Sequence, residues 1–110
     1  MESTSLEISP EELHRRLQAG DDLKLVDVRE PEEYEYCHLP GSLLLPLDEV
    51  PRRAHEIRTE GPVVLICHHG VRSSHALAYL RQHLGRSNVL NLRGGVAAWA
   101  AQVDPDFPTY

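Results

Sequence analysis

The sequence predicts an α/β fold: a small, mainly parallel five-stranded sheet with helices on both faces. Short apolar runs alternate with amphipathic segments along the chain, which is the pattern of strand-helix units in parallel sheets. The chain has 110 residues, of which 41% are hydrophobic, enough for one core but not for two. We therefore expect a single domain over residues 1–110, with an irregular C-terminal tail at 103–110.

The first predicted strand covers residues 6–8, and a helix is predicted directly after it. Ser9 is a favourable N-cap, Pro10 fits the first helical position, and Glu12 stands where a capping box needs its carboxylate. Apolar residues at helical spacing follow, and Gly20 ends the pattern.

Two further strands are predicted before the middle of the chain. Residues 23–28 form an apolar run, and residues 32–36 can form one helical turn after it. Residues 42–45 form another buried strand. The segment 48–57 then predicts a helix that carries Pro51 in its first turn, where proline is tolerated.

The second half of the chain continues the alternation. The Gly61-Pro62 pair breaks the chain before a fourth strand at residues 63–66. Residues 73–84 give the strongest helical pattern, and Gly85 follows at the position where a helix commonly ends. Three leucines are expected on the buried face of that helix: Leu77, Leu80 and Leu84.

The fifth strand is predicted at residues 89–92, and a short helix after Gly94 and Gly95 runs through Trp99. Parallel sheets bind their ligands at the carboxyl ends of the strands. Cys67 directly follows the fourth strand and therefore lies at such an end. The segment from Cys67 to Ser73 is the first candidate for a functional site.

Cys67 is the candidate nucleophile. Only a thiolate is a good nucleophile, so the surroundings must favour the anion. The free NH groups of the following helix, the Arg72 guanidinium and the NH groups of a tightly curled loop would all do so. Gly70 gives that loop the conformational freedom it needs. The alternative is a buried cysteine that caps a core strand and has no chemical role.

Composition excludes several classes of protein. A formal net charge of -6 argues against nucleic-acid binding, and no apolar run is long enough to cross a membrane. The amino terminus has no pattern typical of a secretory signal, so we expect a cytoplasmic protein with its two cysteines reduced. Residues 61–103 contain four arginines and no Asp or Glu, which indicates either a field that attracts anions or basic side chains that face different directions.

Three blocks in order resemble the rhodanese family of sulfurtransferases in its single-domain form. The first joins Asp27-Val28-Arg29 to Glu33-Tyr34 and to the segment 38–42, the second is the loop 67–73, and the third combines Leu92-Arg93-Gly94-Gly95 with Trp99. The resemblance covers almost the whole chain. It implies a rhodanese-like fold and a thiosulfate sulfurtransferase in which Cys67 is catalytic and carries a persulfide.

The resemblance also implies which residues surround the sulfur. The active loop after Cys67 would consist of His68, His69, Gly70, Val71, Arg72 and Ser73. Asp27, Arg29 and His38 are expected to support the site rather than to touch substrate. Arg72 can bind the donor anion or brace the loop through a carboxylate of the Asp27 or Glu33 block, and we favour bracing because arginine suits a bidentate pair.

The partners implied are a small anionic sulfur donor and an acceptor that is cyanide or a thiol, including a protein thiol. No metal or organic cofactor is needed. Partly protonated His68 and His69 would make the loop more cationic. Together with Cys67 they resemble soft metal ligands, but a zinc site needs a fourth ligand.

Cys37 stands before His38, where rhodaneses usually have glycine. It is either a resolving thiol for Cys67 or a small buried side chain. Two other functional classes compete with sulfur transfer. Cysteine phosphatases and arsenate reductases use a Cys-to-Arg loop with one more residue than Cys67 to Arg72, and a rhodanese-like domain can also serve as a non-catalytic binding or sulfur-carrier module.

Overall fold

The computed structural model describes residues 6–110 and shows one five-stranded sheet with the order β1-β5-β4-β2-β3. Within these residues every strand pair is parallel. The strands are β1 (Glu7–Ile8), β2 (Lys24–Asp27), β3 (Leu43–Leu44), β4 (Val63–Ile66) and β5 (Val89–Leu92). The predicted α/β fold class is confirmed.

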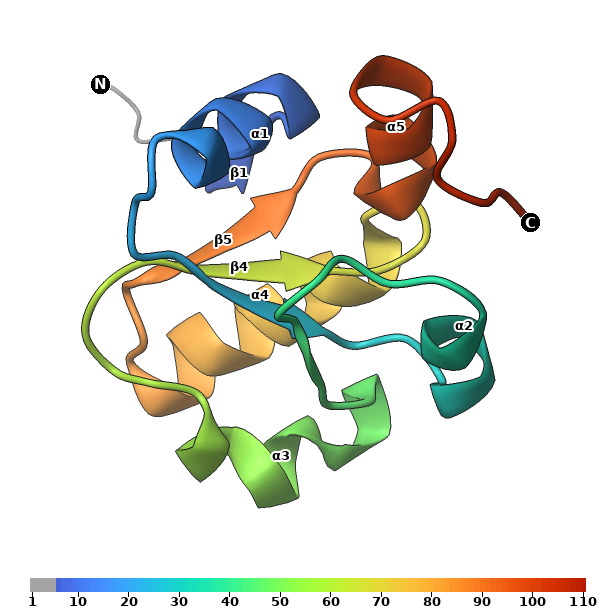
Figure 1. The fold of residues 1–110 in the computed structure, drawn as a ribbon. Helices are drawn as coiled ribbons and strands as arrows, with labels where there is room; N and C mark the ends of the chain where they lie inside the picture. Colours follow the sequence, from blue (N-terminus) through green and yellow to red (C-terminus); the bar gives the residue numbers. More distant parts are fainter. Residues whose placement is uncertain (1–5) are drawn as a thin grey trace.

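Helices cover both faces of the sheet (Figure 1). Helices α1 and α5 pack on one face, and α3 and α4 pack on the other. The helices are α1 (Pro10–Gln18), α2 (Pro31–Tyr36), α3 (Val50–Arg53), α4 (Val71–Leu84) and α5 (Gly95–Gln102). Two 3₁₀ turns flank α3, at Leu47–Glu49 and at Ala54–Glu56.

Strand β4 is the centre of the sheet, and all four of its residues are buried. Its side chains alternate between two apolar cores, as the pleat of a strand requires. Val64 and Ile66 face the core under α1 and α5, which we call the α5-side core. Val63 and Leu65 face the core under α3 and α4, which we call the α4-side core. Because β4 is buried on both faces, its sequence is continuously apolar.

The helix predicted for residues 48–57 is wrong as a single helix. The α-helical part is only Val50–Arg53, and its ends continue as the two 3₁₀ turns. Pro51 occupies the first turn of α3 and has no NH to donate, so it can begin an α-helix but cannot extend one from earlier residues. The expected stretch therefore breaks into three short pieces.

Helix α4 begins earlier than predicted, at Val71 rather than at residue 73. Gly70 is its N-cap with φ of 94°, and Gly85 ends it with φ of 65°. Leu77 and Leu80 are buried as expected, but Leu84 is 42% exposed. The buried face of α4 therefore ends before its last turn, and the apolar spacing of the three leucines overstates it.

Helix α1 begins as predicted: the Ser9 hydroxyl accepts a hydrogen bond from the Glu12 backbone NH at 3.0 Å. The Glu12 carboxylate binds Arg15 instead of closing the capping box. The reciprocal capping box lies at α2, where Glu30 and Glu33 cap each other's backbone NH. That pattern makes α2 longer than the single turn expected, and it fixes the position of Glu33.

The tail at 103–110 follows α5 (Figure 1), and its last two residues contact Tyr36 at the end of α2. After the last turn of α5 it is irregular, and Phe107, 9% exposed, anchors it in the α5-side core. Within residues 6–110, no helix combines the length and the apolar character that a membrane span requires.

Candidate active site

Cys67 lies between β4 and α4, and the residue is 1% exposed. Its Sγ atom accepts hydrogen bonds from the Gly70 backbone NH at 3.0 Å and from the Ser73 hydroxyl at 3.3 Å. Gly70 has a left-handed backbone conformation, which residues other than glycine rarely adopt without strain. The chain can thus turn back on itself within three residues and aim an NH at the sulfur. Both donors stabilise negative charge on Sγ.

The backbone of Cys67 and His68 is held by the start of α5. The Val96 NH donates to the Cys67 carbonyl oxygen at 2.9 Å, and the Ala97 NH donates to the His68 carbonyl oxygen at 3.0 Å. A Cβ on Gly95 would overlap both of those carbonyl oxygens. The Gly94-Gly95 block therefore permits the close approach that fixes the loop.

Asn91 on β5 also supports the loop, and sequence analysis did not identify it. Asn91 is 4% exposed, donates from Nδ2 to the Gly70 carbonyl oxygen at 3.1 Å, and accepts from the Ser73 hydroxyl through Oδ1. Ser73 has a single hydroxyl proton for two acceptors, Asn91 Oδ1 and Cys67 Sγ. The available signal was an amide in the apolar run 89–92, since a buried amide must find partners.

Arg72 is paired with Glu33 through two parallel hydrogen bonds of 2.7 and 2.9 Å. The Glu33 carboxylate also accepts from the Glu30 backbone NH at 2.9 Å. The hydrogen bonds from Arg72 are the main cause that lowers the pKa of Glu33 to about 2, against the opposing effect of burial. With its guanidinium committed to Glu33, Arg72 is placed to brace the loop against α2.

The ion pair predicts an acid-dependent loss of stability. The pKa of Glu33 falls from its ordinary 4.5 to about 2 on folding, so its contribution is complete above pH 4.5 and is lost as pH falls toward 2. We expect Glu33→Gln to remove on the order of 2 kcal/mol of unfolding free energy near neutral pH, with the difference from wild type shrinking in acid. Urea unfolding across this pH range measures the difference in unfolding free energy between wild type and Glu33→Gln. A difference that stays the same at all pH values would contradict the prediction. Glu32→Gln, on the exposed side of α2, is the control.

Asp27 and Arg29 form a second, fully buried ion pair at the end of β2. Arg29 Nη2 lies 2.7 Å from Asp27 Oδ2 and donates to the Cys37 carbonyl oxygen at 2.6 Å. Burial acts to lower the pKa of Arg29, but the hydrogen bonds with Asp27 raise it overall. Because Asp27 is in register with Ile66, the residue before Cys67, this pair stands beside the candidate nucleophile without bonding to its sulfur.

Tyr110 in the tail joins the two ion pairs and was not identified from the sequence. Its hydroxyl accepts from Arg29 Nη1 at 2.8 Å and donates to Glu33 Oε2 at 3.0 Å. Its ring stacks on His68 with centroids 3.9 Å apart and planes 13° apart. Burial is the first cause that raises the pKa of Tyr110 to about 12. An aromatic residue in an irregular tail carries no sequence signal for such contacts.

The histidines differ in their placement. His68 stacks on both His69 and Tyr110. Burial, followed by repulsion from His69, lowers the pKa of His68 below its usual 6.5. This lower pKa makes a protonated, positively charged His68 less favourable than it would be for an exposed histidine. His38 is exposed and stacks on Tyr34, with Nδ1 2.7 Å from the Tyr34 carbonyl oxygen.

The basic side chains of residues 61–103 do not all face Cys67. Arg72 binds Glu33, Arg93 binds Glu7, and Arg86 donates to backbone carbonyls of Ala54 and Ile57. The excess of arginine in the sequence thus corresponds, for these three residues, to separate structural contacts. The hydrogen bonds to Cys67 Sγ come instead from the Gly70 NH and the Ser73 hydroxyl.

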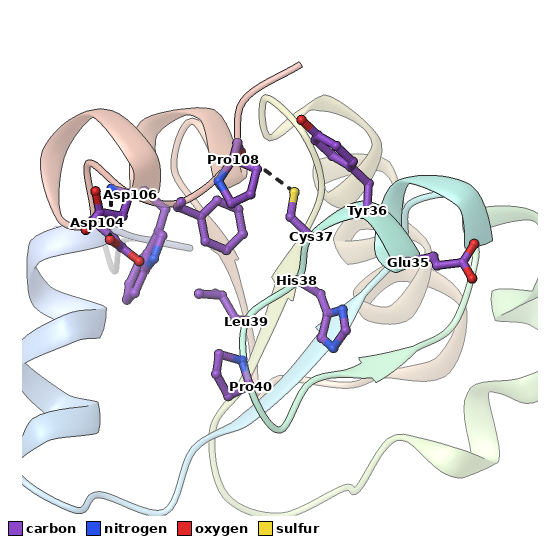
Figure 2. A pocket seen from close by; sticks show the side chains of 11 residues that line it. Glu35, Tyr36, Cys37, His38, Leu39, Pro40, Asp104, Asp106 and Pro108 are labelled. Carbon is purple, nitrogen blue, oxygen red and sulfur yellow. Dashed lines mark hydrogen bonds between the residues drawn. The ribbon is translucent and has the colours of Figure 1, made fainter.

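Cys37 is a buried free thiol that belongs to the α5-side core, whereas Cys67 belongs to the α4-side core. Figure 2 shows the Cys37 sulfur directed at the Pro108 carbonyl oxygen, 3.7 Å away, at the edge of a pocket of about 480 Å³. The two thiols therefore lie in cores on opposite faces of the sheet. This arrangement favours the interpretation of Cys37 as a small buried side chain over that of a resolving thiol.

Comparison with known proteins agrees with this geometry. The family model for the Rhodanese-like domain matches residues 9–102. A sulfurtransferase of Allochromatium vinosum is 46% identical over 94 residues, which cover 86% of this chain and 87% of that protein. An adenylyltransferase and sulfurtransferase of Drosophila sechellia is 39% identical over 115 residues, covering 98% of this chain but only 25% of that protein.

Solved structures give the same result. The rhodanese-like domain protein of Staphylococcus aureus has a TM-score of 0.80 at 27% identity, covering 94% of this chain and 97% of that one. A thiosulfate sulfurtransferase of Pseudomonas aeruginosa has a TM-score of 0.77 at 26% identity, covering 88% of this chain and 19% of that one. By its sequence blocks, its parallel sheet and its cysteine loop, this chain belongs to the rhodanese-like domain family, whose sulfurtransferase members are among its relatives.

Proposed function

We propose that the protein is a sulfurtransferase that carries a sulfane sulfur on Cys67, taken from a small anionic donor such as thiosulfate and delivered to cyanide or a thiol. The observation that carries the proposal is the position of Cys67 Sγ, which accepts hydrogen bonds from Gly70 and Ser73 at the carboxyl end of the central strand. The names of the sulfurtransferase relatives support the same class of reaction.

The reaction divides into two substitutions at sulfur. In the first, the Cys67 thiolate attacks the outer sulfur of thiosulfate; the new S–S bond forms as the donor S–S bond breaks, and its electron pair leaves with sulfite. In the second, the acceptor attacks the outer sulfur of the persulfide, and the electron pair returns to Cys67 as thiolate. Neither step requires a metal or an organic cofactor.

Loop residues have separate roles in this proposal. The Gly70 NH and the Ser73 hydroxyl stabilise Cys67 as the attacking thiolate and again as the leaving thiolate. Ser73 has one hydroxyl proton for Sγ and Asn91 Oδ1, and negative charge on Sγ favours donation to the sulfur. Arg72 keeps the far end of the loop in place through Glu33. A reducing, cytoplasmic location would keep Cys67 available as a thiol.

The intact mass of the protein tests the proposal. Reduced protein incubated with thiosulfate is expected to gain the mass of one sulfur atom, to map that sulfur to the peptide of Cys67, and to lose it on addition of cyanide or dithiothreitol. A protein that gains no sulfur, or that gains it on Cys37, would overturn the proposal. Hydrolysis of an aryl phosphate by the same preparation would favour the phosphatase alternative instead.

A further inference from the structure

Tyr110 contacts one end of the active loop directly and is linked to the other end through Glu33. At the near end, the phenol ring stacks on His68, the residue that follows Cys67. At the far end, the hydroxyl donates to Glu33, whose carboxylate holds Arg72. The contacts His68–Tyr110–Glu33–Arg72 therefore form a continuous chain from one end of the loop to the other.

Hydrogen bonds and ring contacts hold the Tyr110 side chain in place, although the side chain is not deeply buried. Its hydroxyl is fixed by Arg29 as well as by Glu33, and its ring also meets Tyr36 edge to face at 5.9 Å. Yet Tyr110 remains 48% exposed. Such a residue can separate from its partners at a lower cost in free energy than a core side chain can.

The tail is anchored in a core close to Tyr110. Phe107 is 9% exposed and packs into the α5-side core. Between Phe107 and Tyr110, the Thr109 carbonyl oxygen accepts from the Tyr36 hydroxyl at 3.4 Å. Pro108, Thr109 and Tyr110 also line a small cavity of about 100 Å³ together with His68 and His69. Phe107 therefore anchors the tail, and residues 108–110 lie against the active loop.

We propose that Tyr110 is a specificity-determining residue whose ring, held by Arg29 and Glu33, walls the active loop and restricts Cys67 to slender reagents while the tail is closed. Cys67 is 1% exposed in this arrangement, and the Tyr110 ring lies on His68, the residue that follows it. A bulky donor, or a thiol on another protein, requires the tail to move away. For sulfur transfer, this inference rests on the proposed function.

Chemical labelling of Cys67 tests the inference without reference to sulfur transfer. Iodoacetamide serves as the slender reagent and a fluorescein-linked maleimide as the bulky one, with peptide mass spectrometry separating Cys67 from Cys37. In Tyr110→Ala we expect the maleimide rate at Cys67 to rise about ten-fold or more, and the iodoacetamide rate to rise much less. Tyr110→Phe keeps the ring but loses two anchoring hydrogen bonds. Its ratio of maleimide to iodoacetamide labelling rates at Cys67 is therefore expected to lie between the ratios of wild type and Tyr110→Ala.

Tyr79→Ala is the matched control, because it removes a tyrosine ring that packs on the α4-side core beside His83. Any change in labelling rates that Tyr79→Ala causes measures the effect of destabilising the fold in general. An unchanged ratio of the two labelling rates in Tyr110→Ala would overturn the inference, as would an equal change of that ratio in Tyr79→Ala. Melting temperatures of all variants show whether each remains folded during labelling.

A donor series extends the test to the proposed reaction. Persulfide formation is compared for thiosulfate and for the bulkier benzenethiosulfonate. Tyr110→Ala is expected to raise the rate with benzenethiosulfonate relative to that with thiosulfate. An unchanged ratio of these two rates would contradict the proposed role of Tyr110. If wild type forms no persulfide from either donor, the proposed function fails while the labelling result still decides the role of Tyr110.

Discussion

Cys67→Ser is expected to form no persulfide and to lose sulfur transfer by a factor of about a thousand or more. A serine hydroxyl stays protonated at neutral pH and is a poor nucleophile toward sulfur, while the Gly70 NH and the Ser73 hydroxyl that contact Sγ remain in place. The expected loss is thus one of chemistry rather than of loop structure. Steady-state assays with thiosulfate and cyanide measure turnover, and intact mass measures the persulfide.

Cys37→Ser is the matched control for this variant. Cys37 is also a buried free thiol, but its sulfur contacts Pro108 and belongs to the other core. Cys37→Ser is expected to retain turnover close to that of wild type. A Cys67→Ser protein that still takes up sulfur would show that the transferring thiol is elsewhere, and comparable losses in both variants would point to a relay between the two cysteines.

Arg29→Met is expected to destabilise the fold by about 3–5 kcal/mol, the typical cost of removing one partner from a buried ion pair. The guanidinium is fully buried and binds Asp27, the Cys37 carbonyl oxygen and the Tyr110 hydroxyl. Methionine fills similar volume but leaves the Asp27 carboxylate buried without its counter-charge. The free energy of unfolding is measured by urea denaturation near neutral pH.

Two comparisons identify the cause of that loss. Adding Asp27→Leu to Arg29→Met removes the stranded carboxylate and is expected to recover part of the stability. Arg15→Met removes one side of the Arg15–Glu12 pair, whose side chains are 67% and 44% exposed, and is expected to have a much smaller effect because water screens that pair. The explanation fails if Arg29→Met and Arg15→Met lower the unfolding free energy equally.

The supporting residues show where sequence reasoning stops. Arg72 and Glu33 lie 39 positions apart, and their types suggest an ion pair, but only the placement of α2 beside the loop selects Glu33 over Asp27. Asp27 is instead taken by Arg29, two residues away on the same strand end. Composition allows either pairing, and packing decides between them because it places Glu33 on α2 against Arg72 and Arg29 against Asp27.

Secondary structure was predictable where local rules act alone. Strand β4 has its predicted bounds, because an apolar run between Gly61-Pro62 and a tight loop can only be a short buried strand. Prediction failed at 48–57, where Pro51 allows several short helical forms, and at the start of α4, where Val71 rather than Ser73 is the first helical residue. These boundaries depend on which backbone NH and carbonyl groups form hydrogen bonds with residues distant in the sequence.

Cys67, its loop and the parallel sheet were determined by the sequence itself, since apolar periodicity, glycine positions and the spacing from Cys67 to Arg72 act over a few residues. The tertiary structure decided what surrounds the sulfur: Asn91 beneath Ser73, Glu33 on Arg72, and Tyr110 on His68. These contacts join residues 18 to 42 positions apart. Local pattern cannot specify them, because they form only when the strand ends, α2 and the tail meet at one edge of the sheet.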